Sequence, residues 1–316
     1  MVAKVFIDGA VGTTGLEIHE RLANRRDVEL VRLGESKRKD SRARGEALNR
    51  ADLVILCLPD EAAKEAVTLI EGKAVKVIDA STAHRVAPGW TYGFPEMEAD
   101  QRAKIANSNR VANPGCWPTG FLALVRPLTR AGIIPSDFPL TVNGVSGYSG
   151  GGKAMIEEFE KAGSPHYVET VARSYGLSLA HKHAPEMKAY SGLTHGPVFS
   201  PNVGRYYRGM IVDVPLPLWA LPKKSTPAQI HAVLSEAYRD EPLVEVAGPE
   251  EIASLKTLDA ESLKNTNKLK LYVFANEAME QVRLTCVLDN LGKGASGAAV
   301  QNMNIMLGFP ETAGLL

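Results

Sequence analysis

The sequence predicts an α/β protein: a doubly wound parallel-sheet domain followed by an α+β domain with a mostly antiparallel sheet. Its 316 residues correspond to about two domains of ordinary size. The first third alternates short apolar runs with amphipathic stretches, a pattern typical of a parallel sheet covered by helices on both faces. Beyond Asn113-Pro114-Gly115 the apolar segments are longer and alternate with polar residues, as in antiparallel strands that bury one face.

The strands of the first domain are predicted at short apolar runs: Val2–Ile7, Val28–Leu33, Leu53–Leu58, Val75–Ile78 and Val111–Ala112. Between them, Leu16–Asn24 and Glu61–Ile70 carry apolar residues at helical spacing. Near the end of the chain, Ala295–Leu307 places apolar residues on one helical face, which we expect to pack back on the first domain. The predicted domains are therefore 1–115 plus 290–316 and 116–289.

In the second domain a helix is expected from near Pro118 to Gly132, because proline suits the first turn of a helix. A strand at Leu140–Val145 and a helix from Ala154 to Lys161 flank a glycine-rich stretch. The segment Pro222–Ala260 is expected to be a helical insertion. The alternating strands are Arg208–Val214 and Glu280–Leu288.

The composition argues against several classes of protein. Lys plus Arg and Asp plus Glu both number 36, and non-specific nucleic-acid binding needs an excess of cations. Apolar runs such as Leu53–Leu58 are far shorter than the ~20 residues that span a bilayer. The N-terminus resembles a strand and not a signal peptide. Three cysteines cannot form a complete disulfide framework, so we expect a cytoplasmic protein.

A glycine-rich turn follows the first predicted strand and opens the first predicted helix. It reads Asp8-Gly9-Ala10-Val11-Gly12-Thr13-Thr14-Gly15, a variant of the dinucleotide-binding pattern. Glycines let the backbone approach a pyrophosphate, and the helix start offers N–H groups to it. The turn therefore predicts a Rossmann-type cofactor site at Gly9, Gly12, Thr13, Thr14 and Gly15. The alternative is an ordinary glycine-rich turn.

The second predicted strand is followed by Glu35-Ser36-Lys37-Arg38-Lys39. An acidic residue here binds a ribose 2′-hydroxyl, whereas basic residues accommodate a 2′-phosphate. Because one acid is followed by a serine and three cations, we favour NADP over NAD, with Ser36, Lys37 and Arg38 at the phosphate. The alternative is that the basic run is a solvated loop.

Cys116 has a setting unlike that of the other two cysteines. Cys57 and Cys286 lie in apolar strand segments and are expected to be packed, inert thiols. Cys116 precedes Pro118 at a predicted helix start, where the positive end of the helix favours a thiolate. The alternative role for Cys116 is packing in a loop.

A reactive thiol needs a base, and the densest histidine cluster is His181-Lys182-His183. In an extended segment the two imidazoles would point the same way, and histidine transfers protons near neutral pH. A metal pair is the competing interpretation. No further ligands at zinc spacing accompany the cluster, so we expect no metal.

Five motifs together identify a family resemblance. They are the glycine turn, Asn113-Pro114-Gly115-Cys116-Trp117-Pro118-Thr119, Val145-Ser146-Gly147-Tyr148-Ser149-Gly150, His181-Lys182-His183-Ala184-Pro185-Glu186 and Asp289-Asn290-Leu291-Gly292-Lys293-Gly294. In this order they resemble the shorter N-acetyl-γ-glutamyl-phosphate reductases of arginine biosynthesis, over essentially the whole chain. The glycine turn is also similar to that of aspartate-semialdehyde dehydrogenases.

The resemblance implies NADPH-dependent reduction of N-acetylglutamyl 5-phosphate to the semialdehyde, with release of phosphate. It implies that Cys116 is the nucleophile and His183 the acid–base residue. A thiolate that displaces phosphate forms a thioester and divides one hard step into two easier ones. The resemblance also implies a substrate-binding role for Arg85, although His84 beside it departs from the family pattern.

The remaining site residues are also assigned through the resemblance. It implies a substrate pocket containing Tyr175, His181, Glu186 and Ser149, and cofactor contacts at Ser146, Gly147 and Asn290. The stretch Ser146–Lys153 is glycine-rich and could hold phosphate through N–H groups, or be a flexible surface turn. Likewise Asp289–Gly294 could be a packing turn, and Glu186 could be solvated.

Three other interpretations stay open. The chain could reduce another acyl phosphate, aspartyl or carrier-linked aminoadipyl, with the same chemistry. It could also be a redox sensor that binds NADP without turnover.

The strand-rich second domain must cover its outer face, so we expect a homodimer or homotetramer, with no nucleic-acid or membrane partner.

Overall fold

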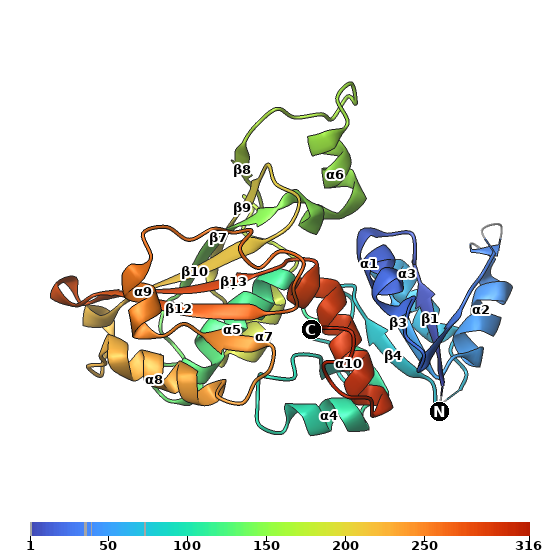
Figure 1. The fold of residues 1–316 in the computed structure, drawn as a ribbon, viewed down its shortest axis with the longest axis horizontal. Coiled ribbons are helices and arrows are strands. Elements are labelled where there is room, and N and C mark those ends of the chain that lie inside the picture. Colours follow the sequence, from blue (N-terminus) through green and yellow to red (C-terminus); the bar gives the residue numbers. More distant parts are fainter. Residues whose placement is uncertain (1, 35–36, 39, 73) are drawn as a thin grey trace. The chain divides into compact units, whose positions relative to one another are not determined.

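The computed structural model describes residues 2–34, 37–38, 40–72 and 74–316. The chain forms two compact units (Figure 1). The first contains Met1–Gly115 and Ala295–Leu316, and the second contains Cys116–Gly294. The sequence placed the return to the first unit at residue 290, whereas the contacts of residues 290–294 lie within the second unit.

The first unit is built on a six-stranded parallel sheet in the order β2-β1-β3-β4-β6-β5. The order reverses direction at β1 and β3, as in a doubly wound sheet, so the predicted fold class is confirmed. The inner strands are almost wholly buried because helices cover them, which explains their uninterrupted apolar sequences. The strands are β1 Ala3–Asp8, β2 Val28–Val31, β3 Leu53–Leu56, β4 Lys76–Asp79, β5 Thr91–Tyr92 and β6 Arg110–Ala112.

Helix α10, Gly297–Leu307, packs within the first unit against α1, α4 and β4, as predicted. The expectation of a single apolar face was wrong, because Gln301, Asn302 and Asn304 are also fully buried. Their amides are bonded, for example Asn302 Nδ2 to the Gly93 carbonyl at 2.8 Å, which removes most of the cost of burial. The other helices of this unit are α1 Thr13–Leu22, α2 Ser41–Arg50, α3 Asp60–Thr68 and α4 Gln101–Asn107.

The second unit contains a seven-stranded sheet in the order β11-β12-β13-β10-β7-β9-β8. Only the pairs β11–β12 and β7–β9 are parallel, so the predicted mostly antiparallel sheet is confirmed. The sequence did not predict β8, β9, β11 or β12. The strands are β7 Thr141–Gly147, β8 Ala172–Ser174, β9 Val198–Gly204, β10 Met210–Pro217, β11 Val244–Val246, β12 Leu269–Asn276 and β13 Gln281–Leu288.

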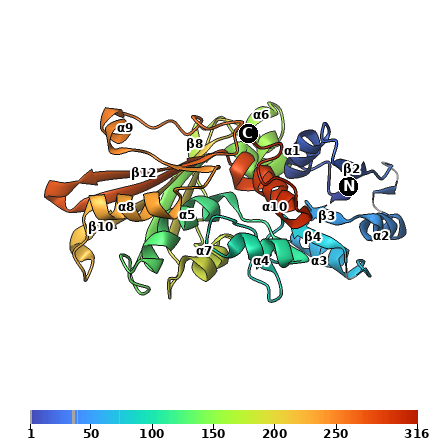
Figure 2. The same ribbon diagram turned by 60° about the horizontal axis from the view of Figure 1, so that its bottom comes forward.

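Two helices, α5 Cys116–Arg130 and α8 Pro227–Ala237, pack on one face of this sheet (Figure 2). Thr226 and Gln229 form reciprocal cap bonds that start α8 just before Pro227. The helical insertion expected at Pro222–Ala260 is only partly correct, because strand β11 lies between α8 and the short helix α9, Pro249–Ser254. Helix α7, Ala184–Ser191, packs against α5.

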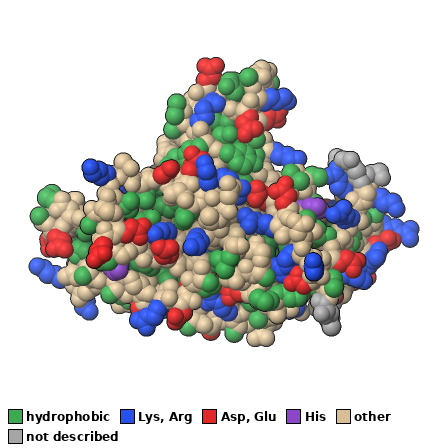
Figure 3. Space-filling model, in the orientation of Figure 1, with side chains coloured by type: hydrophobic (Ala, Val, Ile, Leu, Met, Phe, Trp, Pro, Cys, Tyr) green, Lys and Arg blue, Asp and Glu red, His purple; other side chains and the backbone are tan. Residues whose placement is uncertain are grey.

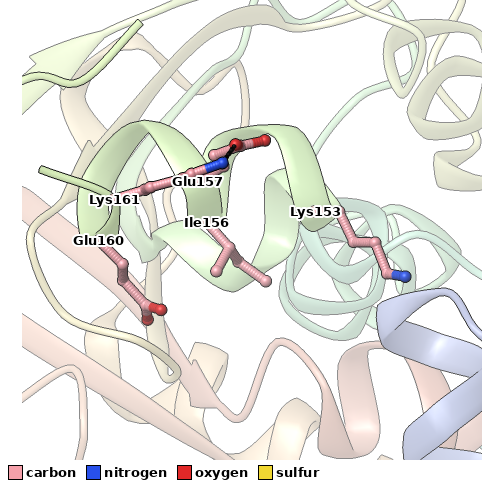
Figure 4. Close-up of a pocket in the computed structure, with 5 residues that line it drawn as sticks. All are labelled: Lys153, Ile156, Glu157, Glu160 and Lys161. Carbon is pink, nitrogen blue, oxygen red and sulfur yellow. Dashed lines mark hydrogen bonds and ion pairs between the residues drawn. The ribbon is translucent and has the colours of Figure 1, made fainter. Parts of the chain in front are cut away.

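Helix α6, Gly152–Glu160, follows the glycine-rich end of β7. Its outer side borders a hollow of about 400 Å³ lined by Lys153, Ile156, Glu157, Glu160 and Lys161 (Figure 4). An ion pair of 2.6 Å joins Lys161 to Glu157. No residue assigned to the candidate site lines this hollow.

The surface carries both signs of charge, in keeping with the balanced composition. Figure 3 shows basic and acidic side chains spread over the visible face. Among the residues that the structure describes, no helix is long and apolar enough to cross a membrane.

Candidate active site

Helix α5 begins at Cys116, two residues before the predicted start near Pro118. The residues that lead into it are held in the first unit through Asn113. Arg85 Nε donates to the Asn113 carbonyl at 3.0 Å, and Asn113 Nδ2 donates to the Ala295 carbonyl at 3.0 Å. The backbone before the cysteine is therefore fixed by bonds from two distant segments.

Aromatic and imidazole rings gather beside Cys116 in the second unit. Trp117 Nε1 donates to the Tyr175 hydroxyl at 2.9 Å, and the Trp117 and Phe199 rings lie 5.1 Å apart. The His181 ring lies 5.7 Å from Tyr175 and 5.1 Å from Phe199. The structure thus brings Tyr175 and His181, two predicted substrate residues, into one cluster with the residue that follows Cys116.

Tyr175 is neutral in this setting. Burial raises the pKa of its phenol above the ordinary value, and the neighbouring Cys116 raises it further. The hydroxyl oxygen accepts from Trp117, so its own proton remains available for donation.

The histidine segment is a turn that leads into α7, so the side-chain alternation of an extended segment does not apply to it. Pro185 and Glu186 occupy the first turn of α7, where fixed φ and negative charge both favour a helix start. The His183 N–H donates to His181 Nδ1 at 3.1 Å, and the two rings lie 4.8 Å apart. The imidazoles are still neighbours, and this bond assigns the acceptor role to His181 Nδ1.

His183 and Glu186 are both buried, with exposed fractions of 7% and 1%. A solvated Glu186, one of the sequence alternatives, is therefore excluded. Burial and the nearby Glu186 carboxylate raise the pKa of Tyr190 to about 12. Across the described residues, no group of three or more His, Cys, Asp or Glu side chains could hold a metal ion.

The other two cysteines are poorly suited to react. Burial raises the pKa of the Cys57 thiol to about 12, with help from Asp79 and Asp8. Burial likewise raises the pKa of the Cys286 thiol well above its ordinary value. Both sulfurs stay protonated at neutral pH, whereas Cys116 lies at a helix start, a setting that favours a thiolate.

The predicted glycine turn lies between β1 and α1. Gly9 has φ +90°, and a Cβ there would lie 2.2 Å from the Cys57 carbonyl oxygen. A Cβ on Gly15 would lie 2.4 Å from the Gly9 oxygen. No side chain caps α1 at Gly12, so its first turn can offer N–H groups to an anion. This cradle fits the pyrophosphate of a dinucleotide.

Of the predicted 2′-phosphate residues, Ser36 lies outside the described residues. Lys37 is exposed and Arg38 is half-buried, in the segment that follows β2. The Lys37 N–H donates to the Gly34 carbonyl at 2.9 Å.

The glycine-rich stretch Ser146–Lys153 is packed at its start, whereas Gly150, Gly151 and Lys153 are exposed. Ser146 and Ser149 are buried, and Asn290 Nδ2 donates to Ser149 Oγ at 2.9 Å. Asn290 Oδ1 accepts from the Gly209 N–H at 2.7 Å. A Cβ on Gly147 would lie 2.6 Å from the Tyr207 carbonyl. Both amide atoms of Asn290 are therefore engaged with the protein.

Arg85 is buried in the first unit, with an exposed fraction of 7%. Its Nη2 donates to the Ala80 carbonyl at 3.3 Å, in addition to the Asn113 bond. Beside it His84 Nδ1 lies 2.6 Å from Asp79, and its ring stacks on Trp90 at 4.1 Å. His84, where the sequence departs from the family pattern, is thus largely buried and has its own partners, Asp79 and Trp90.

Sequence reasoning missed several residues that shape the site. Trp117 and Phe199 have no ionisable or nucleophilic group, so only their contacts show that they shape the site. Asp289 ends β13 in the buried sheet and pairs with Arg208 Nε at 2.7 Å. Lys293 is almost fully buried, and no sequence pattern distinguishes a buried lysine from a solvated one.

Comparison with known proteins agrees with this architecture. Residues 4–105 match the semialdehyde dehydrogenase NAD binding domain, and residues 116–290 match the semialdehyde dehydrogenase dimerisation domain. Aspartate semialdehyde dehydrogenase II from Vibrio cholerae superposes with a TM-score of 0.72 at 16% identity, over 97% of this chain and 98% of that one. The fold and site define an oxidoreductase of the semialdehyde dehydrogenase class that uses a nicotinamide cofactor.

Sequence relatives identify the family within this class. N-acetyl-gamma-glutamyl-phosphate reductase from Trichormus variabilis is 51% identical over 99% of both chains. The enzyme of that name from Brucella ovis is 52% identical over 98% of this chain and 100% of its own. The chain belongs to the N-acetyl-γ-glutamyl-phosphate reductase family, and the predicted resemblance is confirmed.

Proposed function

We propose that the chain reduces N-acetyl-L-glutamyl 5-phosphate to the 5-semialdehyde, with NADPH as hydride donor and phosphate as the leaving group. Family membership supports the substrate and the overall reaction. The observation that carries the mechanism is the position of Cys116. It opens a long helix, its neighbours are Trp117 and Tyr175, and His181 and His183 belong to the same ring cluster.

In the first step the Cys116 sulfur attacks the acyl carbon and phosphate leaves with the electrons of the C–O bond. The product is a thioester on Cys116, which accepts hydride readily because it is neutral and lacks the phosphate charge. When bound, the reduced nicotinamide supplies that hydride. The resulting hemithioacetal collapses to the aldehyde and regenerates the Cys116 thiolate.

His183 is the acid–base residue of this scheme. It takes the thiol proton before attack, returns it to the oxyanion that hydride transfer leaves, and takes it back as the hemithioacetal collapses to the aldehyde and the Cys116 thiolate. His181 supports it, because His181 Nδ1 accepts the His183 backbone N–H and so fixes the turn between them. Neutral Tyr175 is a further donor for the substrate oxygen or acyl chain.

The substrate has two anionic ends, and Arg85 is proposed to bind one of them through guanidinium donors. Glu186 and Ser149 complete the proposed substrate residues. Glu186 is buried and fixed at the start of α7, a setting suited to accept a bond from the substrate amide.

The cofactor is proposed to bind at Gly9, Gly12, Thr13, Thr14 and Gly15, with Lys37 and Arg38 at its 2′-phosphate. The uncapped first turn of α1 supports the first assignment. The two cations support NADP over NAD. We also propose a cytoplasmic homodimer or homotetramer, in keeping with the match to a dimerisation domain.

The test of the function is NADPH oxidation in the presence of N-acetylglutamyl phosphate. Cys116→Ser should lower kcat by about a thousandfold or more while NADPH affinity is retained, because only the nucleophile is changed. Cys57→Ser and Cys286→Ser are matched controls and should keep turnover. Full activity in Cys116→Ser would remove the thioester from the mechanism, and no turnover in the unmodified protein would favour a sensor.

Thiol labelling gives an independent check. At pH 8 iodoacetamide should modify Cys116 and leave Cys57 and Cys286 unmodified, because their raised pKa values keep both sulfurs protonated. Labelling of Cys57 should appear only as the pH approaches about 12 or the protein unfolds.

A further inference from the structure

The turn after β13 is built around the buried carboxylate of Asp289. Its Oδ1 accepts the N–H groups of Leu291 at 2.9 Å and Gly292 at 3.1 Å. Its Oδ2 accepts the Asn265 N–H at 2.5 Å and pairs with Arg208 Nε at 2.7 Å. One side chain thus fixes the turn through bonds to its own backbone and to two other segments.

The same turn presents Gly294 to the cysteine. The Gly294 N–H donates to the Asp289 carbonyl at 3.0 Å, within a single π-helical turn over Gly292–Ser296. A Cβ on Gly294 would lie 2.7 Å from the Cys116 Cβ and 3.3 Å from its Cα. Real Cβ contacts are not that short, so the bare α-carbon of Gly294 sets how close the turn comes to Cys116.

Conformational freedom does not explain this glycine. Gly294 is absent from the residues with positive φ, so another residue could adopt its backbone conformation. Space is the constraint, and the atoms that take up that space belong to Cys116 and to the Asp289 carbonyl, 3.1 Å from the same Cβ position. An interrupted helical turn of this kind is frequent at functional sites.

We propose that Asp289 and Gly294 are positioning residues for the nucleophile: the buried carboxylate fixes the turn, and the turn seats Cys116 at the start of α5. The proposal rests on the nucleophilic role of Cys116 stated above. It gives the Asp289–Gly294 motif a role in catalysis through the protein backbone.

The test compares two glycines with equal crowding. A Cβ on Gly120 would also meet its nearest atom at 2.7 Å, but that atom is Cγ2 of Val212 in the core under α5. Gly294→Ala and Gly120→Ala therefore both overpack the second unit, but the crowding at Gly294 is against the Cys116 side chain and the crowding at Gly120 is against Val212. Gly45→Ala, where a Cβ meets nothing within 4 Å, is the neutral control.

Gly294→Ala should lower kcat by about a hundredfold, since displacements near 1 Å at a reacting atom cost that much. It should also change the rate and pH midpoint of Cys116 alkylation, with the NADPH dissociation constant unchanged. Gly120→Ala should lower the unfolding temperature, and its folded fraction should keep the kcat and alkylation profile of the unmodified protein. Equal loss of kcat in both variants would overturn the proposal.

A double variant keeps the proposal testable if Gly294→Ala does not fold. Cys116→Gly removes the Cβ that would be struck, so Gly294→Ala should cost little stability in that background. If the double variant also fails to fold, the added Cβ clashes with the Asp289 carbonyl and not with Cys116, and the proposal is wrong. Turnover by Cys116→Ser would instead reject the proposed function, whereas the stability coupling between positions 116 and 294 would still hold.

Discussion

Two glycine turns of this protein look alike in sequence and use their N–H groups differently. Each begins with a buried aspartate at the end of a strand: Asp8 is the last residue of β1, and Asp289 directly follows β13. Each aspartate pairs with an arginine, Arg44 at 2.8 Å and Arg208 at 2.7 Å. Each turn also carries a glycine pressed against a neighbouring segment.

The difference lies in what satisfies the backbone. The Asp289 carboxylate accepts the N–H groups of Leu291 and Gly292 from its own turn and a third N–H from Asn265 in another segment, so these donors are bonded within the protein. The turn after Asp8 leads into α1 without a side-chain cap, which leaves the helix start available for an anion. The backbone hydrogen bonds therefore support our proposals that the first turn binds the cofactor and that the second positions another residue, although both sequence patterns suggest a cofactor site.

Gly9→Ala is the strongest way to break this comparison. The substitution adds a Cβ 2.2 Å from the Cys57 carbonyl at φ +90°, so we expect a loss of about 3 kcal/mol or more in the free energy of unfolding. The protein that still folds should no longer bind NADPH when binding is measured by fluorescence titration. Unchanged NADPH affinity would show that this turn does not hold the pyrophosphate.

Asn290→Ala should have the next largest effect, and on stability instead of cofactor binding. It removes the bond to Ser149 and leaves the buried Gly209 N–H without its acceptor, at a cost of about 2–3 kcal/mol in urea unfolding. Ser149→Ala, which removes one of the two bonds, should cost about 1 kcal/mol. If stability is unchanged and NADPH affinity falls tenfold or more, the predicted cofactor contact of Asn290 is supported. A tenfold loss of affinity corresponds to about 1.4 kcal/mol of binding free energy.

A charge reversal at Lys37 and Arg38 tests whether the cofactor proposed to bind the first turn is NADP or NAD. The double variant Lys37→Glu, Arg38→Glu should weaken NADPH binding by about tenfold or more, because charged bonds to the 2′-phosphate are lost. NADH lacks that phosphate, so its KM should stay the same or fall. Equal losses for the two cofactors would mean that the basic run is only a solvated loop.

Much of the fold was predictable because its signals are local. The parallel strands are short continuous apolar runs, and α8 begins at a threonine–proline pair, so periodicity and cap chemistry located them. Strand β9 was missed because Ser200, Pro201 and Asn202 interrupt its apolar pattern, and its pairing with β7 and β8 is non-local. The sequence left the backbone of the histidine segment open, and the helix start that Pro185 and Glu186 favour was not predicted.

The candidate site was predicted less completely than the fold. Cys116, His181 and His183 were named from motifs and Tyr175 from the family resemblance. In the structure Tyr175 bonds to Trp117, His181 lies beside Tyr175, and His183 lies beside His181. Asp289, Arg208 and Gly294 could not be given roles, because a buried ion pair and a close approach depend on tertiary packing. Sequence shows which residue types are present, and the backbone decides which of them touch.

The most direct measurement is the mass of the enzyme after it meets its substrate without cofactor. Protein mixed with N-acetylglutamyl phosphate and quenched in acid should carry an N-acetylglutamyl group on the peptide that contains Cys116, with one equivalent of phosphate released. Cys116→Ser should release no phosphate and carry no thioester, and Cys286→Ser should behave as the unmodified protein. Phosphate release without an adduct, or an adduct on another residue, would contradict the thioester mechanism.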